Sequence, residues 1–271
     1  MAKVLVVTSG KGGVGKTTST AALGAALAQS GRSVVVVDFD VGLRNLDLVM
    51  GAERRVVFDL INVIQGDARL SQALIRDKRI ETLHLLPASQ TRDKDALTQE
   101  GVNRVIGELK EKFDWVICDS PAGIEKGAML AMHNADMAVV VTNPEISSVR
   151  DSDRIIGMLD SKTARAEKGE RVEKHLLLTR YNPARAMRGE MLKVDDVLEI
   201  LSIPLLGIVP ESEAVLAASN VGAPVVLHAP DSAPARAYSD AAKRLQGETL
   251  PVSVPEERRG LMSKLFGRRV A

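Results

Sequence analysis

The chain has 271 residues, of which 45% are hydrophobic and 26% are charged, a composition typical of a soluble globular protein. The formal net charge is only +1, so any electrostatic attraction to a charged partner must come from a local site. Cys118 is the only cysteine, which excludes a disulfide within the chain and a cysteine-ligated iron–sulfur cluster within one subunit. We expect no secretory signal, because the apolar run 4–7 is short, is preceded only by Lys3 and is followed by no small-residue cleavage site. We expect no transmembrane helix, because no stretch reaches ~18 consecutive apolar residues.

Short apolar runs, rich in β-branched residues and without polar alternation, recur along the chain. Runs of this kind predict strands that are buried on both faces of a sheet. They cover residues 4–7, 34–37, 83–86, 115–117, 138–141, 176–178 and 204–209.

Stretches with helical spacing lie between the apolar runs, at 17–29, 95–112, 124–133, 147–161 and 235–245. Gly31 is placed like the glycine that ends a helix. Strand–helix alternation predicts an α/β fold, with a mostly parallel twisted sheet and helices on both faces. We expect one domain over residues 1–250, followed at 251–271 by a linker and a tail of different composition.

A glycine-rich segment matches the phosphate-binding pattern G-x-x-x-x-G-K-[ST], directly after the first predicted strand and at the start of the first predicted helix. Backbone N–H groups and the helix N-terminus would then face an anion. Lys16 would reach the β- and γ-phosphates, and Thr17 would ligate Mg²⁺. An ordinary glycine-rich turn is the alternative, which the strand-before and helix-after context disfavours. The residues expected around the phosphates are Gly10, Lys11, Gly12, Gly13, Val14, Gly15, Lys16, Thr17 and Thr18.

Lys11 is a second lysine within this loop. It is either a solvated loop lysine or a second cation for the γ-phosphate, supplied by this chain or by a symmetry mate.

Three aspartates follow predicted strands. Asp119 ends the run 115–117, as in the Walker B pattern, where the carboxylate holds Mg²⁺ or its water. Asp38 and Asp40 follow the second run and would lie beside the phosphate loop if that strand neighbours the first. One could organise the Mg²⁺ shell and the other could orient water, or either could cap a turn or helix. Cys118 is expected to be a buried structural thiol.

The nucleotide base is predicted from an absent motif. Guanine-specific P-loop proteins usually read the base with N-K-x-D, and no asparagine here is followed by lysine. The sequence therefore favours ATP over GTP.

The segment 11–18, Lys-Gly-Gly-Val-Gly-Lys-Thr-Thr, resembles the deviant Walker A motif of the MinD/ParA ATPases. Residues 38–47, Asp-Phe-Asp-Val-Gly-Leu-Arg-Asn-Leu-Asp, narrow the resemblance to the septum-placing MinD branch. The stretches 86–94, 118–123, 142–145 and 147–153 agree, and the resemblance covers essentially the whole chain.

This resemblance implies roles for single residues. Lys11 would reach across an ATP-bound homodimer to the partner's nucleotide, and Asp40 would position or deprotonate the attacking water with Asn45 nearby. The implied catalytic set is Lys11, Lys16, Asp40 and Asn45, and the implied Mg²⁺ set is Thr17, Asp38 and Asp119. Arg180, Asn182, Pro210 and Glu211 would frame the adenine.

Partners are implied in the same way. Residues 38–47 and 119–123 would form switches I and II. A division inhibitor of the MinC type and an activator of the MinE type would meet the segment 147–153 and Arg44. The partner-facing residues are Arg44, Ser147, Asp151 and Asp153.

Residues 256–271 form a cationic amphipathic segment with five basic and two acidic residues. Such a segment predicts attachment to an anionic membrane surface, with a helix docked on the body or a frayed end as alternatives. Two tails on one dimer would gain avidity on the order of 10²–10⁴-fold, so ATP-driven dimerisation would control membrane residence. On a helix the apolar face comprises Leu261, Met262, Leu265 and Phe266, flanked by Lys264 and Arg268.

The leading hypothesis is therefore an ATPase switch with ATP and Mg²⁺ as cofactors, cytoplasmic and peripheral on the inner face of the membrane. A ParA-type ATPase bound to DNA is the second reading, disfavoured because the chain without its tail is slightly acidic. A P-loop enzyme acting on a small molecule is the third, and it would need a substrate pocket.

Overall fold

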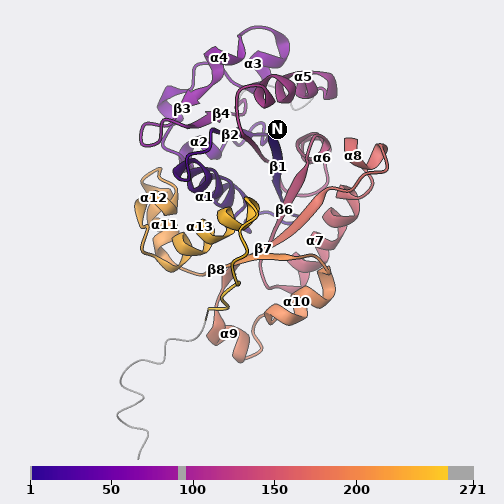
Figure 1. The fold of residues 1–271 in the computed structure, drawn as a ribbon, viewed down its shortest axis with the longest axis vertical. Coiled ribbons are helices and arrows are strands. Elements are labelled where there is room, and N and C mark those ends of the chain that lie inside the picture. The colour runs from indigo at the N-terminus through magenta and orange to yellow at the C-terminus, as the bar shows by residue number, and fades with distance from the viewer. Residues whose placement is uncertain (1, 91–95, 256–271) are drawn as a thin grey trace, which may run out of the picture.

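The computed structural model describes residues 2–90 and 96–255, which build one eight-stranded sheet (Figure 1). The strand order is β3-β4-β2-β5-β1-β6-β7-β8, and every described pair is parallel except β3 with β4. The strands are β1 (Lys3–Thr8), β2 (Val34–Asp38), β3 (Ile75–Arg76), β4 (Leu83–Leu86), β5 (Trp115–Asp119), β6 (Met137–Thr142), β7 (Glu173–Tyr181) and β8 (Leu205–Pro210).

Helices cover both faces of this sheet, as Figure 1 shows. The longer ones are α1 (Lys16–Gln29), α5 (Gln99–Lys110), α6 (Lys126–His133), α7 (Ile146–Leu159), α10 (Val194–Leu201), α11 (Glu213–Asn220) and α13 (Ala233–Leu245). The shorter ones are α2 (Leu46–Val49), α3 (Leu60–Gln65), α4 (Leu70–Ala73), α8 (Ala164–Glu167), α9 (Pro183–Met187), α12 (Val225–His228) and the 3-10 turn Glu53–Arg55.

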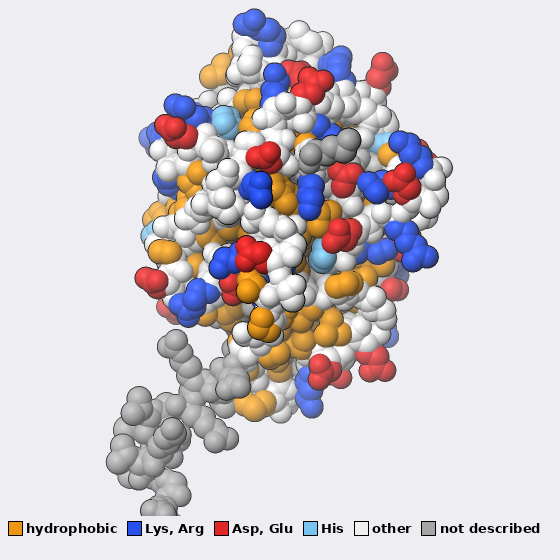
Figure 2. Space-filling view, viewed as in Figure 1, with side chains coloured by type: hydrophobic (Ala, Val, Ile, Leu, Met, Phe, Trp, Pro, Cys, Tyr) orange, Lys and Arg blue, Asp and Glu red, His pale blue; other side chains and the backbone are white. Residues whose placement is uncertain are grey.

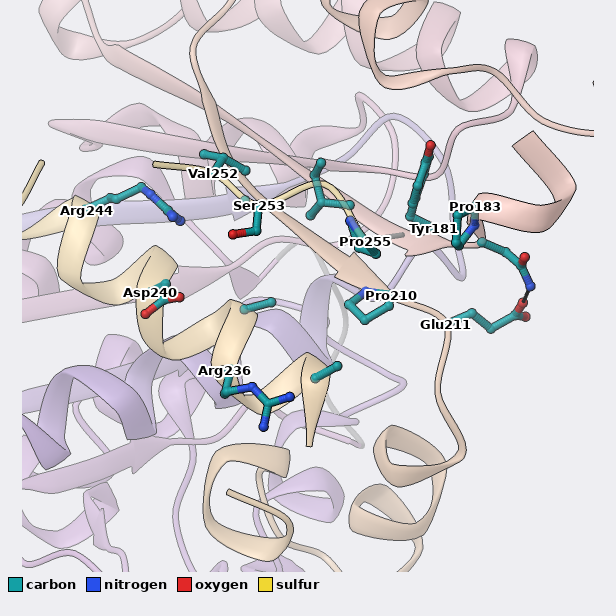
Figure 3. Close-up of a pocket in the computed structure, with 15 residues that line it drawn as sticks. Tyr181, Pro183, Pro210, Glu211, Arg236, Asp240, Arg244, Val252, Ser253 and Pro255 are labelled. Carbon is teal, nitrogen blue, oxygen red and sulfur yellow. Dashed lines mark hydrogen bonds between the residues drawn. The ribbon is translucent and has the colours of Figure 1, made fainter. Parts of the chain in front are cut away.

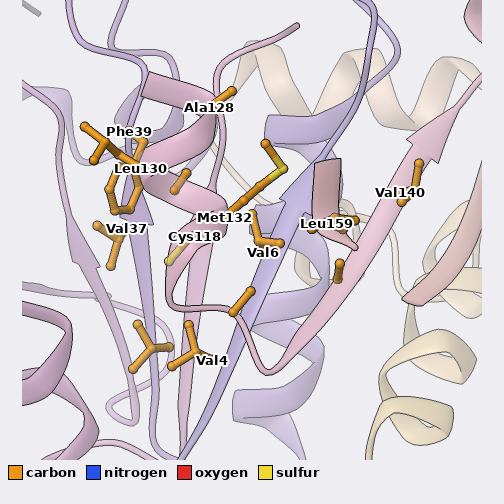
Figure 4. Close-up of a cluster of buried hydrophobic side chains, with 14 of the residues drawn as sticks. Val4, Val6, Val37, Phe39, Cys118, Ala128, Leu130, Met132, Val140 and Leu159 are labelled. Atoms are coloured by element: carbon orange, nitrogen blue, oxygen red, sulfur yellow. The ribbon is translucent and has the colours of Figure 1, made fainter. Parts of the chain in front are cut away.

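Alternate residues of each central strand enter two different cores, because successive side chains of a strand point to opposite faces. In β1, Val4 and Val6 pack in a core with α5, α6 and α7, whereas Leu5 and Val7 pack in a second core with α1, α12 and α13. Figure 4 shows the part of the first core where β1 and β5 meet α6. Cys118 lies in this core, where burial raises the pKa of its thiol to about 12, so the predicted buried thiol is confirmed.

The α/β prediction is confirmed. All seven predicted strands and five predicted helices are present, the strand 83–86 with the predicted bounds and the others with shifted ends. Gly31 has φ +86°, as expected of a glycine that ends a helix. Asp38 and Asp40 are expected beside the phosphate loop if the second strand neighbours the first. This condition is not met, because β5 lies between β1 and β2 and pairs with both. Asp38 therefore lies beside Asp119 rather than directly beside the phosphate loop.

The predicted linker begins on the body of the protein. The Arg244 guanidinium donates to the carbonyl oxygens of Leu250 (2.9 Å) and Pro251 (2.6 Å), and also to that of Leu206 in β8 (2.7 Å). Val252 packs against the first core. Residues 250–252 are thus tied to the edge strand β8.

The surface carries charges of both signs. On the face shown in Figure 2, Lys and Arg side chains alternate with Asp and Glu, and apolar side chains gather toward the end of the molecule that holds β8 and α9. Within the described ranges, no helix is both long and apolar enough to span a bilayer. The predicted membrane tail, including Leu261, Met262, Lys264, Leu265, Phe266 and Arg268, lies outside the described residues.

Candidate nucleotide-binding site

The glycine-rich loop joins the carboxyl end of β1 to the N-terminus of α1, as the motif predicts. Gly13 (φ +75°) and Gly15 (φ +94°) adopt left-handed conformations that side chains with a Cβ disfavour. Gly10 is needed for a different reason, since a Cβ there would lie 2.3 Å from the backbone of Asp151 in α7. The loop is therefore packed directly against α7.

Lys16 is the buried cation of this loop, with only 8% of its surface exposed. Its Nζ donates to Ser9 Oγ (3.0 Å), and Ser9 Oγ donates to the carbonyl oxygen of Lys11 (2.7 Å). Burial lowers the pKa of Lys16, while the carboxylates of Asp119 and Asp40 oppose that shift. The ammonium is thus held at the floor of the loop, where a phosphate would be its natural counter-ion.

Two buried carboxylates lie side by side near this loop, and one of them, Asp119, acts on the Lys16 charge. Asp38 and Asp119 are register partners at the ends of β2 and β5, and Asp119 accepts from the Thr20 hydroxyl (2.8 Å) and from Thr17. Burial raises the pKa of Asp119 to about 6, and burial with the nearby Asp119 charge raises that of Asp38 well above its usual value.

This pair of carboxylates fits a divalent cation. Asp38 and Asp119 are both essentially inaccessible to solvent, and their mutual repulsion would be relieved by a cation. The hydroxyl of Thr17 and the two carboxylates supply the oxygen ligands that Mg²⁺ prefers. These three residues could therefore hold Mg²⁺ next to nucleotide phosphates.

A cavity of about 600 Å³ opens above the loop. Asp40 and Asn45 both line it, as do Leu48 and Val49 of α2. Asp38 fixes the backbone of this part of the cavity lining, because its carboxylate accepts from the backbone N–H of Asp40 (2.8 Å) and of Leu46 (3.2 Å). Asp38 thus also has the turn-capping role that the sequence left open. The other lining residues are Gly12, Gly13, Gly15, Lys16, Thr17, Thr18, Leu43, Ser120, Pro121, Ala122, Glu125 and Arg180.

Lys11 points elsewhere. Its Nζ lies 3.1 Å from Glu145 Oε2 and 3.0 Å from Ser147 Oγ, at the N-terminus of α7, with 41% of its side chain exposed. Lys11 is not among the residues that line the 600 Å³ cavity. In this structure it is therefore a partly exposed, ion-paired lysine that lies outside the cavity.

A second cavity, of about 360 Å³, continues from the first and shares Gly15, Thr18 and Arg180 with it. Three of the predicted adenine residues, Arg180, Pro210 and Glu211, line this base-side cavity. Asn182 lines a neighbouring cavity instead and donates to Glu211 Oε2 (3.3 Å).

That neighbouring cavity, of about 490 Å³, lies between α13, the ends of β7 and β8, and the linker residues Val252, Ser253 and Pro255 (Figure 3). Because Pro210 and Glu211 line both cavities, the end of β8 separates the base-side cavity from the linker.

The predicted partner residues occupy two places. Ser147, Asp151 and Asp153 lie on α7, where Ser147 contacts Lys11 and the backbone of Asp151 contacts Gly10. Arg44 has φ +48°, and its Nε lies 2.9 Å from Oδ2 of the buried Asp47. The α7 residues therefore adjoin the phosphate loop, and Arg44 lies within the segment 38–47.

Sequence reasoning missed four contacts of this site. Three are hydrogen bonds, between Ser9 and Lys16, between Thr20 and Asp119, and between the N–H of Leu46 and Asp38. The fourth is the ion pair between Glu145 and Lys11. Thr20 carried a local signal, because it lies one helical turn after Thr17 and so shares its face. The Glu145 contact carried none, since 134 positions separate it from Lys11.

The loop, the buried lysine and the paired aspartates at the carboxyl ends of parallel strands together define a P-loop nucleotide-binding protein. Residues 5–225 match the sequence profile of the CobQ/CobB/MinD/ParA nucleotide binding domain. The chain is 61% identical over 270 residues to the septum site-determining protein MinD of Escherichia coli K12, a match that covers 98% of this chain and 100% of that protein. The chain belongs to this family and, within it, to the MinD septum site-determining proteins.

Solved structures agree. The MinC:MinD cell division protein complex of Aquifex aeolicus contains a chain 41% identical to this one, with a TM-score of 0.84, covering 93% of this chain and 99% of that one. The septum site-determining protein MinD of Pyrococcus horikoshii OT3, complexed with Mg-ADP, is 33% identical, with a TM-score of 0.80, covering 90% and 96% respectively.

Proposed function

We propose that this protein is an ATP-hydrolysing switch that places the division septum, dimerises with ATP and then attaches to the membrane. The observation that carries the proposal is the buried Lys16 ammonium, held at the floor of a P-loop near Asp119, which lies beside Asp38. The Mg-ADP complex of the P. horikoshii relative supports a magnesium nucleotide as the ligand.

The residues divide the chemistry among them. Lys16 and the loop N–H groups bind and orient the β- and γ-phosphates, and Thr17, Asp38 and Asp119 hold Mg²⁺, which supplies charge neutralisation at the phosphates. Asp40 and Asn45 both line the cavity on the α2 side. Asp40 would position or deprotonate the attacking water. The base occupies the cavity lined by Arg180, Pro210 and Glu211.

Dimerisation through the nucleotide face is supported by exposed apolar side chains around it. Leu43 (67% exposed) and Leu48 (51%) line the 600 Å³ cavity above the loop, called the phosphate-side cavity from here on, and Leu216 (64%) lines the base-side cavity. Such side chains favour a protein partner. A second copy in the ATP state would cover them and bring Lys11 to the opposite nucleotide, after Lys11 leaves Glu145.

A MinC-type inhibitor is proposed as a partner because the A. aeolicus relative was solved as a MinC:MinD complex. Arg44, Ser147, Asp151 and Asp153 are proposed to meet it or a MinE-type activator. Because these residues adjoin the phosphate loop and the segment 38–47, a partner bound there would sense the nucleotide state. Residues 256–271 are proposed to attach the dimer to the cytoplasmic face of the membrane.

The test is sedimentation onto vesicles containing anionic lipid, with ATP or ADP, beside a phosphate-release assay. Wild type should sediment with ATP and much less with ADP. Lys16→Gln should lose both hydrolysis and ATP-dependent sedimentation while keeping its melting temperature. Lys168→Gln removes an exposed lysine outside the site and should behave as wild type. A Lys16→Gln protein that hydrolyses ATP at a near wild-type rate would refute the P-loop assignment.

A further inference from the structure

Arg79 lies in the turn between β3 and β4 and joins two segments that are far apart in the sequence. Its Nη2 donates to the carbonyl oxygen of Met50 (2.8 Å), and its Nη1 donates to the carbonyl oxygen of Gly222 (3.0 Å). Asp77, which is buried, fixes the guanidinium through Nη2 (2.7 Å) and Nε (3.2 Å). One planar side chain thus bridges the end of α2 and the loop after α11.

The two bridged segments also touch each other through bare backbone. Gly51 and Gly222 both have φ +63°. A Cβ on Gly51 would lie 2.5 Å from the oxygen of Gly222, and a Cβ on Gly222 would lie 2.7 Å from Cα of Gly51. The two backbones can approach this closely only because both residues are glycine. Arg79 therefore bridges two segments that are already in contact.

Each bridged segment forms one wall of the nucleotide site. Leu48 and Val49 of α2 line the phosphate-side cavity, and the N–H at the start of α2 binds Asp38. Val215 and Ser219 of α11 line the base-side cavity. A continuous path therefore runs from Asp38 through α2, Arg79 and Gly222 to α11.

We propose that Arg79 is a positioning residue that makes α2 and α11 respond to bound nucleotide as one unit. Occupation of the base-side cavity then fixes the switch segment 38–47, which carries Asp40 and Asn45. The inference rests on the proposed function, because it requires a nucleotide in the two cavities. Arg79 itself lies outside both cavities and contacts neither.

Hydrogen exchange of the full chain, with and without Mg²⁺–ADP, tests this coupling. The reporters in α2 are the amides of Val49 and Met50, which donate to Asn45 and Leu46. In wild type, nucleotide should slow exchange in the phosphate loop, α2 and α11 together. In Arg79→Gln, protection of the phosphate loop should persist, while nucleotide-dependent protection of α2 should fall about fivefold or more.

Two further variants sharpen the result. Lys78→Gln removes the adjacent, exposed positive charge and should match wild type. Gly222→Ala leaves Arg79 in place but forces the junction apart, so it should lose the same α2 protection.

The opposing results are distinct. Full α2 protection in both Arg79→Gln and Gly222→Ala would overturn the coupling. Faster exchange spread evenly through β1 and β5 without ligand would also overturn it, because Arg79 would then serve only general stability. If wild type itself showed no protection of the phosphate loop, the proposed function would fail, and the coupling with it.

Discussion

Asp38 and Asp119 stand side by side at the ends of adjacent parallel strands, and neither is accessible to solvent. Their position follows from β5 being inserted between β1 and β2, which brings the Walker B carboxylate between the phosphate loop and switch I. Burial raises the pKa of both carboxyl groups, and the Asp119 charge raises that of Asp38 further, so each favours the protonated form more than it would in water. A divalent cation bound between them would favour the ionised form of both carboxyl groups.

This pair leads to a prediction for Asp119→Asn. The pKa of Asp119 is about 6 in the folded protein, above its unfolded value, so the folded state binds more protons between about pH 4 and pH 6. Wild type should lose stability as pH rises through that window, and Asp119→Asn should lose less, because only the contribution of Asp38 remains. The difference in unfolding free energy should grow by an amount on the order of 2–3 kcal/mol and level off about one unit above the folded pKa.

Denaturant unfolding of the nucleotide-free protein between pH 4.5 and 7.5 measures this difference. Asp119→Asn should also lose Mg²⁺-dependent nucleotide binding. A stability difference that is flat across the pH range would show that Asp119 is not perturbed as described.

Lys11 and Asp40 should separate dimerisation from hydrolysis. The Lys11–Glu145 pair is half-exposed on both sides and contributes about 0–1 kcal/mol, so Lys11→Ala should fold normally. If Lys11 acts across the dimer, this variant loses dimerisation and hydrolysis together.

Asp40→Ala should still dimerise with ATP but release phosphate slowly. Light scattering and phosphate release report the two steps, and an Asp40→Ala protein that stays monomeric with ATP would contradict its role.

Gly10 should be intolerant of a methyl group even though its backbone is not left-handed. The Cβ of Gly10→Ala would overlap the Asp151 backbone, and displacing α7 or the loop should cost about 1–3 kcal/mol of stability. Because the loop shifts, affinity for Mg²⁺–ADP should fall as well. Gly107→Ala, in α5 with open space around it, should instead be stabilising by up to about 1 kcal/mol. Calorimetry of both variants, with and without nucleotide, compares them, and equal melting temperatures would refute the packing argument.

The sequence predicts what local patterns determine. The apolar runs mark the central strands because both faces of these strands are buried, and the phosphate loop is recognisable because glycine positions and a helix start are local features. The two-residue strand β3 and the four-residue helices α2, α4, α8 and α12 escape detection, since four residues contain little more than one helical period.

Contacts that depend on topology are out of reach of the sequence alone. The insertion of β5 between β1 and β2 places Asp38 beside Asp119, and no spacing rule contains that information. Lys11 with Glu145 and Arg79 with Gly222 likewise join residues that only the folded chain brings together. Of the four adenine residues implied by the resemblance, Arg180, Pro210 and Glu211 line the base-side cavity, whereas Asn182 lies one cavity away.

The final prediction concerns the tail, whose residues 256–271 lie outside the described structure. Leu265 is at the centre of the predicted apolar face. A carboxylate at this position must be desolvated and is repelled by anionic lipid, so Leu265→Glu should cost several kcal/mol of membrane binding per tail. ATP binding and dimerisation in solution should survive, because residue 265 is remote in sequence from the residues that line the phosphate-side and base-side cavities.

Vesicle sedimentation with ATP, beside light scattering without vesicles, separates the two properties. Leu265→Glu should dimerise yet fail to sediment, whereas Lys16→Gln should fail in both because it cannot bring two tails together. Val57→Glu makes a comparable charge change at a residue that is 77% exposed on the body, and it should sediment as wild type. If Leu265→Glu sediments as well as wild type in ATP, the tail is not the membrane anchor. Its apolar face would then pack on the protein or on a partner.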